Sequence, residues 1–392
     1  MYPGFRFSVI YRGEGRARCG RLVTPHGAVD TPNFIFCATR GAIKGSTMEA
    51  VRRSGAHIIL GNTYHLWLQP GPDVIEKHGG LHRFVGWEGP MLTDSGGFQL
   101  FSLGFGGVMD EIKGSRRKSR ERSLLTVSEE GALFRSYVDG RPCWLTPERS
   151  ILIQQKLGAD LILPLDECTP FHRTRDETAF SMGRSHRWEK RSFHQWEANY
   201  RPSQALYGIV QGGVYEDLRR ESAEFVNGIP FFGHAIGGSL GGHREQMYTL
   251  VATVQKFLSL DRPVHLLGIG GLRDIVHGVD SGIDTFDCVH PTRIARHGCA
   301  LVFRKDDPKE HINLRNRRYA EDLFPIDLRC DCDTCRWASR SYLHHLLKAR
   351  ESTAGQLLTI HNIRFMAQWM ERIRDAIATD RWASFRQSMG VK

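Results

Sequence analysis

Short apolar runs alternate with helix-like stretches through most of this 392-residue chain, and this alternation limits the possible folds more than any other feature. Intervening segments such as 147–157 and 215–226 carry apolar residues at helical spacing. Repeated strand and helix over this length favours a parallel sheet closed into an eight-stranded (β/α)8 barrel, the TIM-barrel fold. The expected barrel strands are Phe34–Cys37, Ile58–Leu60, Met91–Thr93, Leu161–Leu165, Ala205–Val210, Gly233–Gly237, His265–Ile269 and Thr285–Phe286.

The charge balance is basic, with 53 Lys and Arg residues against 43 Asp and Glu residues. A net charge of +10 favours a polyanionic partner such as nucleic acid, although a merely solvated basic surface would give the same balance. No apolar run approaches the length of a membrane span, and the N-terminus lacks the regions of a signal peptide. We therefore expect a soluble, cytoplasmic protein that does not associate with a membrane.

Polar residues follow directly after five of the expected strands: Asp94, Asp166, Gln211, the pair Gly237–Gly238, and Asp287. In a barrel these positions share the C-terminal face, where such enzymes keep their sites. A single Asp at a strand end is more often a turn former or a helix cap. Five convergent strand ends favour a functional site instead.

Three of the nine cysteines crowd together as Cys330, Cys332 and Cys335, while the others are scattered. This pattern suits metal binding in a reducing compartment better than a disulfide framework. Tetrahedral zinc would need one more ligand. The residues alone leave three candidates, which are His344, His345 and His361.

One segment, Glu111–Arg122, departs from the strand and helix rhythm and carries six Lys or Arg residues. It is typical of an exposed loop, which could be solvated or could contact phosphates.

Several motifs together resemble one family. Leu92-Thr-Asp-Ser-Gly-Gly-Phe-Gln99 and Gly61-Asn-Thr-Tyr-His65 occur with Asp166-Glu-Cys168, Gln211-Gly-Gly213, Gly237-Gly238, Phe286-Asp-Cys-Val289 and Pro291-Thr-Arg293. In this order, from about residue 6 to about residue 385, they closely resemble the bacterial-type tRNA-guanine transglycosylases, or queuine tRNA-ribosyltransferases. The resemblance implies a pentosyltransferase of queuosine biosynthesis that acts on tRNA.

The implied reaction removes the wobble guanine from tRNAs with a G-U-N anticodon (Asp, Asn, His and Tyr) and inserts a 7-deazaguanine base, preQ1 or queuine. An exchange with retention at the sugar is most simply two displacements, which need a carboxylate nucleophile. Asp287 is the candidate nucleophile, and the resemblance assigns Asp94 the general acid and base work.

The resemblance also implies how the base is bound. Asp166 would accept hydrogen bonds from the guanine N1–H and amine, while Gln211 and the Gly238 N–H would donate to O6. The other base-pocket positions are Phe98, Cys168, Ser239 and Gly241.

The target base is stacked in the anticodon loop, so the enzyme must extrude it and hold the flanking phosphates. Arg293 and Arg296 match family positions near the anticodon backbone. The alternative for both is an ion pair with barrel carboxylates.

For the metal, the resemblance selects His361 as the fourth ligand, giving one structural zinc per subunit. His344 and His345 fall in an expected helix, 340–349, whereas His361 would open the next helix. The alternative is an odd trio of core cysteines.

We expect a TIM-barrel catalytic domain over 1–305, opening with a hairpin of Phe7–Tyr11 and Arg21–Thr24. A zinc-binding subdomain over 306–361 would be inserted near the C-terminus, and helices over 362–392 would close the barrel. Family members act as dimers, so a homodimer is implied.

The stretch Gly237–Gly242 departs from the common bacterial pattern by placing Gly241 where valine is usual. Losing that side chain should enlarge the base pocket, which suggests that queuine is accepted. Cys168 keeps the bacterial residue, and Leu267 replaces a frequent methionine.

Two other functions are possible. A non-catalytic partner subunit of the same family would lack the nucleophile and the acid, yet Asp94 and Asp287 are both present. A zinc-dependent tRNA-binding protein would explain the charge and the cysteines but not the carboxylates at several strand ends.

Overall fold

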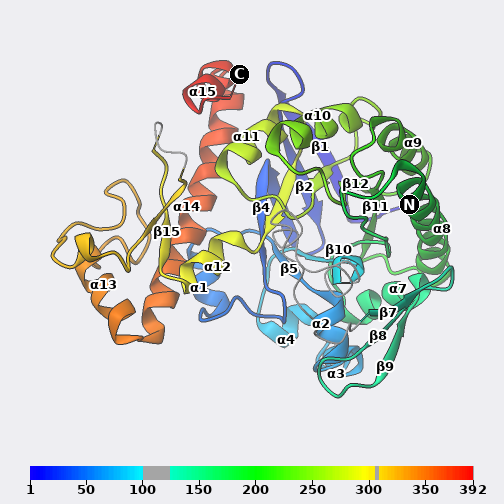
Figure 1. Ribbon diagram of the computed structural model, residues 1–392, viewed down its shortest axis with the longest axis horizontal. Helices are drawn as coiled ribbons and strands as arrows, with labels where there is room; N and C mark the ends of the chain where they lie inside the picture. The colour runs from blue at the N-terminus through cyan, green and yellow to red at the C-terminus, as the bar shows by residue number, and fades with distance from the viewer. Residues whose placement is uncertain (100–123, 305–308, 392) are drawn as a thin grey trace.

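The computed structural model describes residues 1–99, 124–304 and 309–391. Eight parallel strands form a closed barrel in which β14 pairs with β4 and so completes the ring (Figure 1). All eight expected strands are present, and the predicted (β/α)8 fold is confirmed. The barrel strands are β4 (Asn33–Cys37), β5 (Ile59–Gly61), β6 (Met91–Thr93), β10 (Leu161–Ile162), β11 (Ala205–Val210), β12 (Gly233–Ile236), β13 (Val264–Leu266) and β14 (Thr285–Cys288).

Two of these strands are shorter than the apolar runs suggested. β10 ends at Ile162, because the side chain of Gln154 forms hydrogen bonds with both backbone groups of Leu163. The Leu163 N–H donates to Gln154 Oε1 at 3.1 Å, and Gln154 Nε2 donates to the Leu163 carbonyl at 2.8 Å. β13 ends before Gly268, whose φ of 75° turns the chain out of the sheet. Both strands therefore stop early, and the loops that follow them are free to shape the site.

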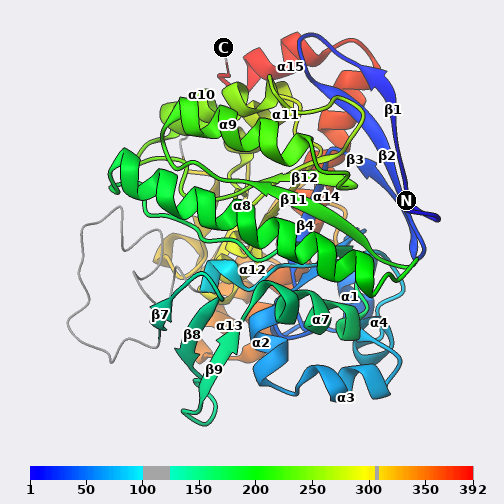
Figure 2. The ribbon, with the colours of Figure 1, turned by 90° about the vertical axis from the view of Figure 1, so that its right-hand side faces the viewer.

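Helices surround the barrel, and Figure 2 shows α8 and α9 lying side by side across its outside. Several of them have a local start signal; α7, for example, begins with Pro147 behind the Thr146 cap, and α8 has a capping box of Thr174 and Glu177. In the described part of the chain, the helices before β14, the last barrel strand, are α1 (Met48–Arg53), α2 (Thr63–Leu68), α3 (Pro72–Lys77), α4 (Leu81–Val85), α7 (Pro147–Leu157), α8 (Arg175–Ala198), α9 (Glu216–Asn227), α10 (Arg244–Gln255) and α11 (Leu272–Asp280).

Two three-stranded antiparallel sheets flank the barrel in the described part of the chain, and a smaller antiparallel pair, β15 (Cys299–Leu301) and β16 (His311–Asn313), lies in the C-terminal part. The expected N-terminal hairpin is present as β1 (Arg6–Arg12) and β2 (Arg18–Thr24), extended by β3 (Gly27–Thr31). A second sheet of β7 (Leu124–Val127), β8 (Ala132–Arg135) and β9 (Pro142–Leu145) lies at another edge of the molecule (Figure 2). Its four-residue strands are too short to give a clear alternating pattern, so it was not predicted.

The chain after β14 folds beside the barrel (Figure 1). Its long helix α14 packs against α12, α13 and β4. A separate cluster of buried apolar side chains lies here and includes Ile312, Leu343 and Leu358. The elements are α12 (His290–Arg296), β15 (Cys299–Leu301), β16 (His311–Asn313), the 3-10 helix η1 (Arg317–Tyr319), α13 (Arg340–Ala349), α14 (Ser352–Ala378) and α15 (Trp382–Ser388).

The start of α14 differs from the sequence prediction. His361 was expected to open this helix, but α14 begins at Ser352 and places His361 in its interior. The first turns contain Ser, Thr and Gly, which are poor helix formers. Burial of Ala354, Leu357 and Leu358 offsets that weakness. The division into domains at 305 and 361 stays a prediction.

Within the described parts of the chain, no helix combines the length and apolarity needed to cross a lipid bilayer. The cytoplasmic location stays a prediction.

Candidate active site

The polar residues predicted from the sequence meet at the carboxyl ends of the barrel strands. Asp94 follows β6, Asp166 follows the short β10, and Gln211 follows β11. Gly238 follows β12, and Asp287 is the third residue of β14. Because the strands are parallel, all five positions lie on the same face of the barrel.

Asp287 is held asymmetrically. Its Oδ1 accepts a hydrogen bond from the Gly268 N–H at 2.9 Å and lies 3.2 Å from His265 Nε2. Among the described residues, only the Cys37 thiol donates to its Oδ2, with the sulfur 3.6 Å away. Thiols are weak donors. The carboxylate is thus fixed through one oxygen, and the other remains lightly held in a side chain that keeps a small exposed surface.

His265 and Cys37 were not predicted as parts of the site. Both occur inside strands that read as apolar runs, so their chemistry was hidden by the pattern. His265 is fully buried, and its Nδ1 lies 2.9 Å from the Thr285 hydroxyl. If that hydroxyl donates to Nδ1, the Nε2–H is left to donate to Asp287.

Asp94 is held by the loop after β5. The Thr63 N–H donates to its Oδ1 at 2.8 Å, and the Asn62 side-chain amide donates to its Oδ2. Desolvation raises the pKa of Asp94 to about 7, and the negative charge of Asp287 adds to the rise. A carboxyl group with that pKa can both give and take a proton near neutral pH.

Asp166 pairs with Gln211, whose Nε2 donates to Oδ2 at 2.6 Å, while the Ser95 hydroxyl donates to Oδ1 at 2.9 Å. Burial raises the pKa of Asp166 to about 6 in spite of these two hydrogen bonds. Gly97 packs so closely that a Cβ there would lie 2.2 Å from Asp166 Oδ1. A side chain at position 97 would therefore displace this carboxylate.

The other predicted base-pocket residues have different surroundings. Phe98 is 48% exposed, and Cys168 is half-buried. The Ser239 hydroxyl is buried, and the described chain offers it no hydrogen-bond partner.

Gly241 lies against the side chain of Gln246. Its φ is 109°, and a Cβ there would lie 2.2 Å from Gln246 Oε1. The space beside Gly241 is thus occupied by the Gln246 side chain. Enlargement of the base pocket by the missing side chain stays a prediction.

Arg293 and Arg296 lie on α12, directly after β14, and both are exposed. Arg296 donates to the Thr292 carbonyl at 3.0 Å. Neither arginine forms an ion pair with a carboxylate in residues 1–99, 124–304 or 309–391, so the alternative of pairing with barrel carboxylates is not observed. The basic segment Glu111–Arg122 lies outside the described residues.

A buried group of Cys330, Cys332, Cys335 and His361 has the donor set of a structural zinc site, with all four ligand atoms within 4.8 Å of one another. His361 Nδ1 lies 3.3 Å from the Cys335 sulfur, and its Nε2 lies 2.9 Å from the Leu301 carbonyl oxygen. A hydrogen bond from Nε2–H to that carbonyl leaves the Nδ1 lone pair directed at the thiols, as a metal ligand requires.

The two other candidate histidines are not part of this group. His344 Nδ1 lies 2.8 Å from the Leu314 carbonyl oxygen, and His345 is exposed.

Comparison with known proteins agrees with this geometry. The family model described as "Queuine tRNA-ribosyltransferase" matches residues 14–391. The chain belongs to the queuine tRNA-ribosyltransferase family. Proteins with that name include one from Roseiflexus sp. (strain RS-1), which is 48% identical over 383 residues, covering 95% of this chain and 96% of the relative. Others are from Protochlamydia amoebophila, 46% identical with 96% of each chain covered, and Thermus thermophilus, 44% identical with 97% and 92% covered.

Membership of the queuine tRNA-ribosyltransferase family confirms the resemblance inferred from the motifs, and it confirms the class of enzyme.

In this family member, a second group of side chains that could bind a metal ion lies at the opposite end of the barrel. His26 Nδ1 and His82 Nε2 lie 2.7 Å and 3.2 Å from the two oxygens of Asp160. The two imidazole rings are stacked, 3.6 Å apart and 11° from parallel. In-plane lone pairs of stacked rings cannot converge on one ion, so we interpret this group as a hydrogen-bonded tie between the β2–β3 turn and the barrel.

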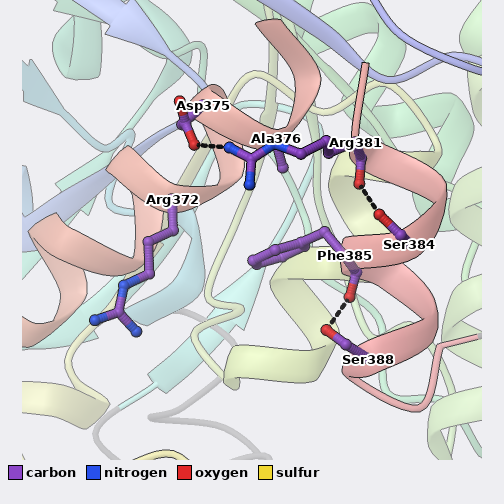
Figure 3. Close-up of a pocket in the computed structure, with 7 residues that line it drawn as sticks. All are labelled: Arg372, Asp375, Ala376, Arg381, Ser384, Phe385 and Ser388. Carbon is purple, nitrogen blue, oxygen red and sulfur yellow. Dashed lines mark hydrogen bonds and ion pairs between the residues drawn. The ribbon is translucent and has the colours of Figure 1, made fainter. Parts of the chain in front are cut away.

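A cavity of about 300 Å³ lies between the end of α14 and α15 (Figure 3). Arg372 and Phe385 line it, and Arg381 is tied across it to Asp375. None of the strand-end residues contributes to this cavity. It is therefore separate from the candidate active site of this queuine tRNA-ribosyltransferase family member.

Proposed function

We propose that this enzyme exchanges the wobble guanine of tRNAs with a G-U-N anticodon for a 7-deazaguanine base. The observation that carries the proposal is that one face of the barrel holds two carboxylates with different surroundings. Asp287 has one lightly held oxygen, and Asp94 has a pKa raised to about 7.

The reaction proceeds by two displacements at the anomeric carbon of the ribose. Asp287 Oδ2 attacks this carbon as the bond to guanine breaks, and Asp94 gives its proton to the departing base. The incoming base then loses its N9 proton to Asp94 and attacks the same carbon, which releases Asp287. Each displacement inverts the carbon, so the product keeps the original configuration.

Guanine is recognised by its Watson–Crick edge and O6. Asp166 accepts from N1–H and the exocyclic amine, while Gln211 and the Gly238 N–H donate to O6. The Gly238 N–H is free to do so, because it makes no hydrogen bond to the described part of the chain. Ser239, Phe98 and Cys168 complete the surroundings of the base.

The tRNA is held through its phosphates as the base is extruded from the anticodon loop. Arg293 and Arg296 are suited to this because both are exposed, adjacent to β14, and unpaired with any carboxylate of the described chain.

Zinc is the metal that we assign to Cys330, Cys332, Cys335 and His361. A closed site of three thiolates and one imidazole has no open position for substrate, so the ion supplies folding free energy rather than catalysis.

The enzyme acts as a homodimer in this proposal. Large apolar side chains are exposed around the metal site, with Phe324 61% and Trp337 62% exposed. Trp337 lies 5.5 Å from the Tyr342 ring, and the Arg340 N–H donates to the Phe324 carbonyl, so these residues share one surface. A second copy would cover it. Light scattering of the purified protein at micromolar concentration tests this part.

The proposed function is tested by a competition. Purified protein receives a tRNA-Asp transcript with equal amounts of preQ1 and queuine, and mass spectrometry identifies the inserted base. Insertion of either base supports the proposal, and the ratio decides between biosynthesis from preQ1 and salvage of queuine. Insertion of neither, with no exchange of labelled guanine, would leave a non-catalytic partner subunit or a zinc-dependent tRNA-binding protein.

A further inference from the structure

Arg219 of α9 is a fully buried cation with no carboxylate partner in the parts of the chain that the structure describes. Its guanidinium donates instead to four backbone carbonyls. Nε donates to Gly213 at 2.8 Å, Nη1 to Val210 at 3.0 Å and Gly237 at 2.7 Å, and Nη2 to Ser239 at 3.2 Å. Burial lowers the pKa of Arg219 to about 10, so the group stays charged at neutral pH.

One of these carbonyls belongs to Val210, the last residue of β11, and the others lie in the two loops that follow β11 and β12. The same loops carry Gln211 and Gly238. One planar group with several donors therefore links the two loops. The contact is close, because a Cβ on Gly212 would lie 2.7 Å from the Arg219 N. One helical turn further along α9, the Ser222 hydroxyl accepts from the Gln211 N–H at 3.0 Å. The inner face of α9 thus fixes the start of both loops.

The bond to Gly237 has a second effect. The Gly237 carbonyl and the Gly238 N–H are the two ends of one peptide group. A cation on the carbonyl polarises this peptide and makes its N–H a stronger donor. That N–H has no hydrogen-bond acceptor in the described chain.

We propose that Arg219 is a positioning residue for recognition of the oxygen at purine position 6 (O6) of the guanine base. It fixes the Gly237–Gly238 peptide and strengthens the Gly238 N–H as a donor to O6. The same donor stabilises negative charge on guanine as its bond to ribose breaks. This inference rests on the proposed function, which assigns the Gly238 N–H to O6.

The test compares guanine with 6-thioguanine, which differs only in carrying sulfur, a weaker acceptor, at position 6. Binding of each base to the purified holoenzyme is measured by calorimetry for wild type, Arg219→Lys, Arg219→Met and Arg220→Met. Arg220 is the matched control, since it is the exposed neighbour on the same helix. The kcat and KM for labelled guanine exchange are measured in parallel.

We expect Arg219→Met to weaken guanine binding by about tenfold, the size of one charge-assisted hydrogen bond, with little change for 6-thioguanine. The preference for guanine then falls, kcat falls with it, and the KM for tRNA stays near the wild-type value. Arg219→Lys keeps the charge and should recover part of the preference, whereas Arg220→Met should match wild type.

An unchanged ratio of guanine to 6-thioguanine affinity in both Arg219 variants would overturn the inference, even if both bases bound more weakly. If Arg219→Met does not fold, the lysine variant alone decides, because its preference must lie below that of wild type. A wild-type protein that binds neither base and exchanges no guanine would overturn the proposed function instead.

Discussion

The two carboxylate oxygens of Asp287 have different hydrogen-bond partners. Gly268 and His265 both contact Oδ1, so the carboxylate cannot rotate without losing these contacts. Among the described residues, Oδ2 has only the Cys37 thiol as a hydrogen-bond donor, and it is the oxygen that we propose attacks the sugar carbon. Such prior orientation removes part of the entropic barrier to attack.

Replacing Asp287 by Asn or Ala tests its role directly. Exchange of labelled guanine into tRNA should fall by at least about a thousandfold, because an amide or a methyl group cannot form the ester to ribose. The tRNA affinity, measured by filter binding, should stay near that of wild type. Turnover in either variant would remove Asp287 from the nucleophile role.

Asp94 gives a prediction for pH. Its pKa is raised to about 7, so the protonated acid needed for guanine departure is depleted as pH rises above that value. In a single turnover without an incoming base, formation of the covalent tRNA adduct should slow by roughly tenfold per pH unit above neutrality. Rapid quenching and denaturing gels measure this rate.

The Asp94→Asn variant is the control, since it should form the adduct slowly and without this pH dependence. A wild-type profile retained in that variant would assign the titration to another group.

At the scale of elements, α14 joins the metal group to the barrel. It carries His361 in its interior and packs against β4, the barrel strand that contains Cys37. Asn362, next to His361, donates to the Pro291 carbonyl at 2.8 Å and accepts from the Leu301 N–H at 2.8 Å. A change in metal binding therefore acts on the helix that supports α12 and its arginines.

The metal assignment predicts that Cys332→Ala loses zinc. Metal analysis should fall from about one ion per chain to about none, and the melting temperature should drop by roughly 10 °C, because the free energy of metal binding stabilises the fold. Cys299→Ala is the matched control, as Cys299 is also buried in this region but lies outside the ligand group. Full zinc content in the Cys332 variant would show that the ligand set is wrong.

At the scale of the whole molecule, the effect of the net charge of +10 on tRNA binding depends on where the cations lie. Many described arginines are tied to carboxylates, as Arg18 is to Asp284 at 2.6 Å. Within the described residues, Arg293 and Arg296 have no such partner, and both lie on α12, the helix that follows the strand of the proposed nucleophile. Cations in that position would bind phosphates of the tRNA segment that enters the site.

Salt dependence measures this contribution. The slope of log affinity for tRNA against log salt concentration should fall in magnitude by roughly 0.7 to 0.9 for Arg293→Gln, and again when Arg296→Gln is added. Arg220→Gln, on the outer face of α9, should leave the slope unchanged. Equal slopes for all variants would place the phosphate contacts elsewhere.

The sequence by itself determined the barrel, because strand and helix periodicities are local and all eight apolar runs became barrel strands. It also located Asp94, Asp166, Gln211 and Asp287, since the ends of parallel strands must meet on one face. The cysteine cluster was predictable from spacing alone.

Only the tertiary structure decided which distant side chains meet. His265 and Cys37 look like members of apolar strands, and barrel closure brings both to Asp287. Arg219 resembles any basic residue of an amphipathic helix, yet packing of α9 directs it to two loops. The filling of the space beside Gly241 by Gln246 likewise depends on a loop conformation. Such contacts join residues far apart in the chain, and local patterns carry no information about them.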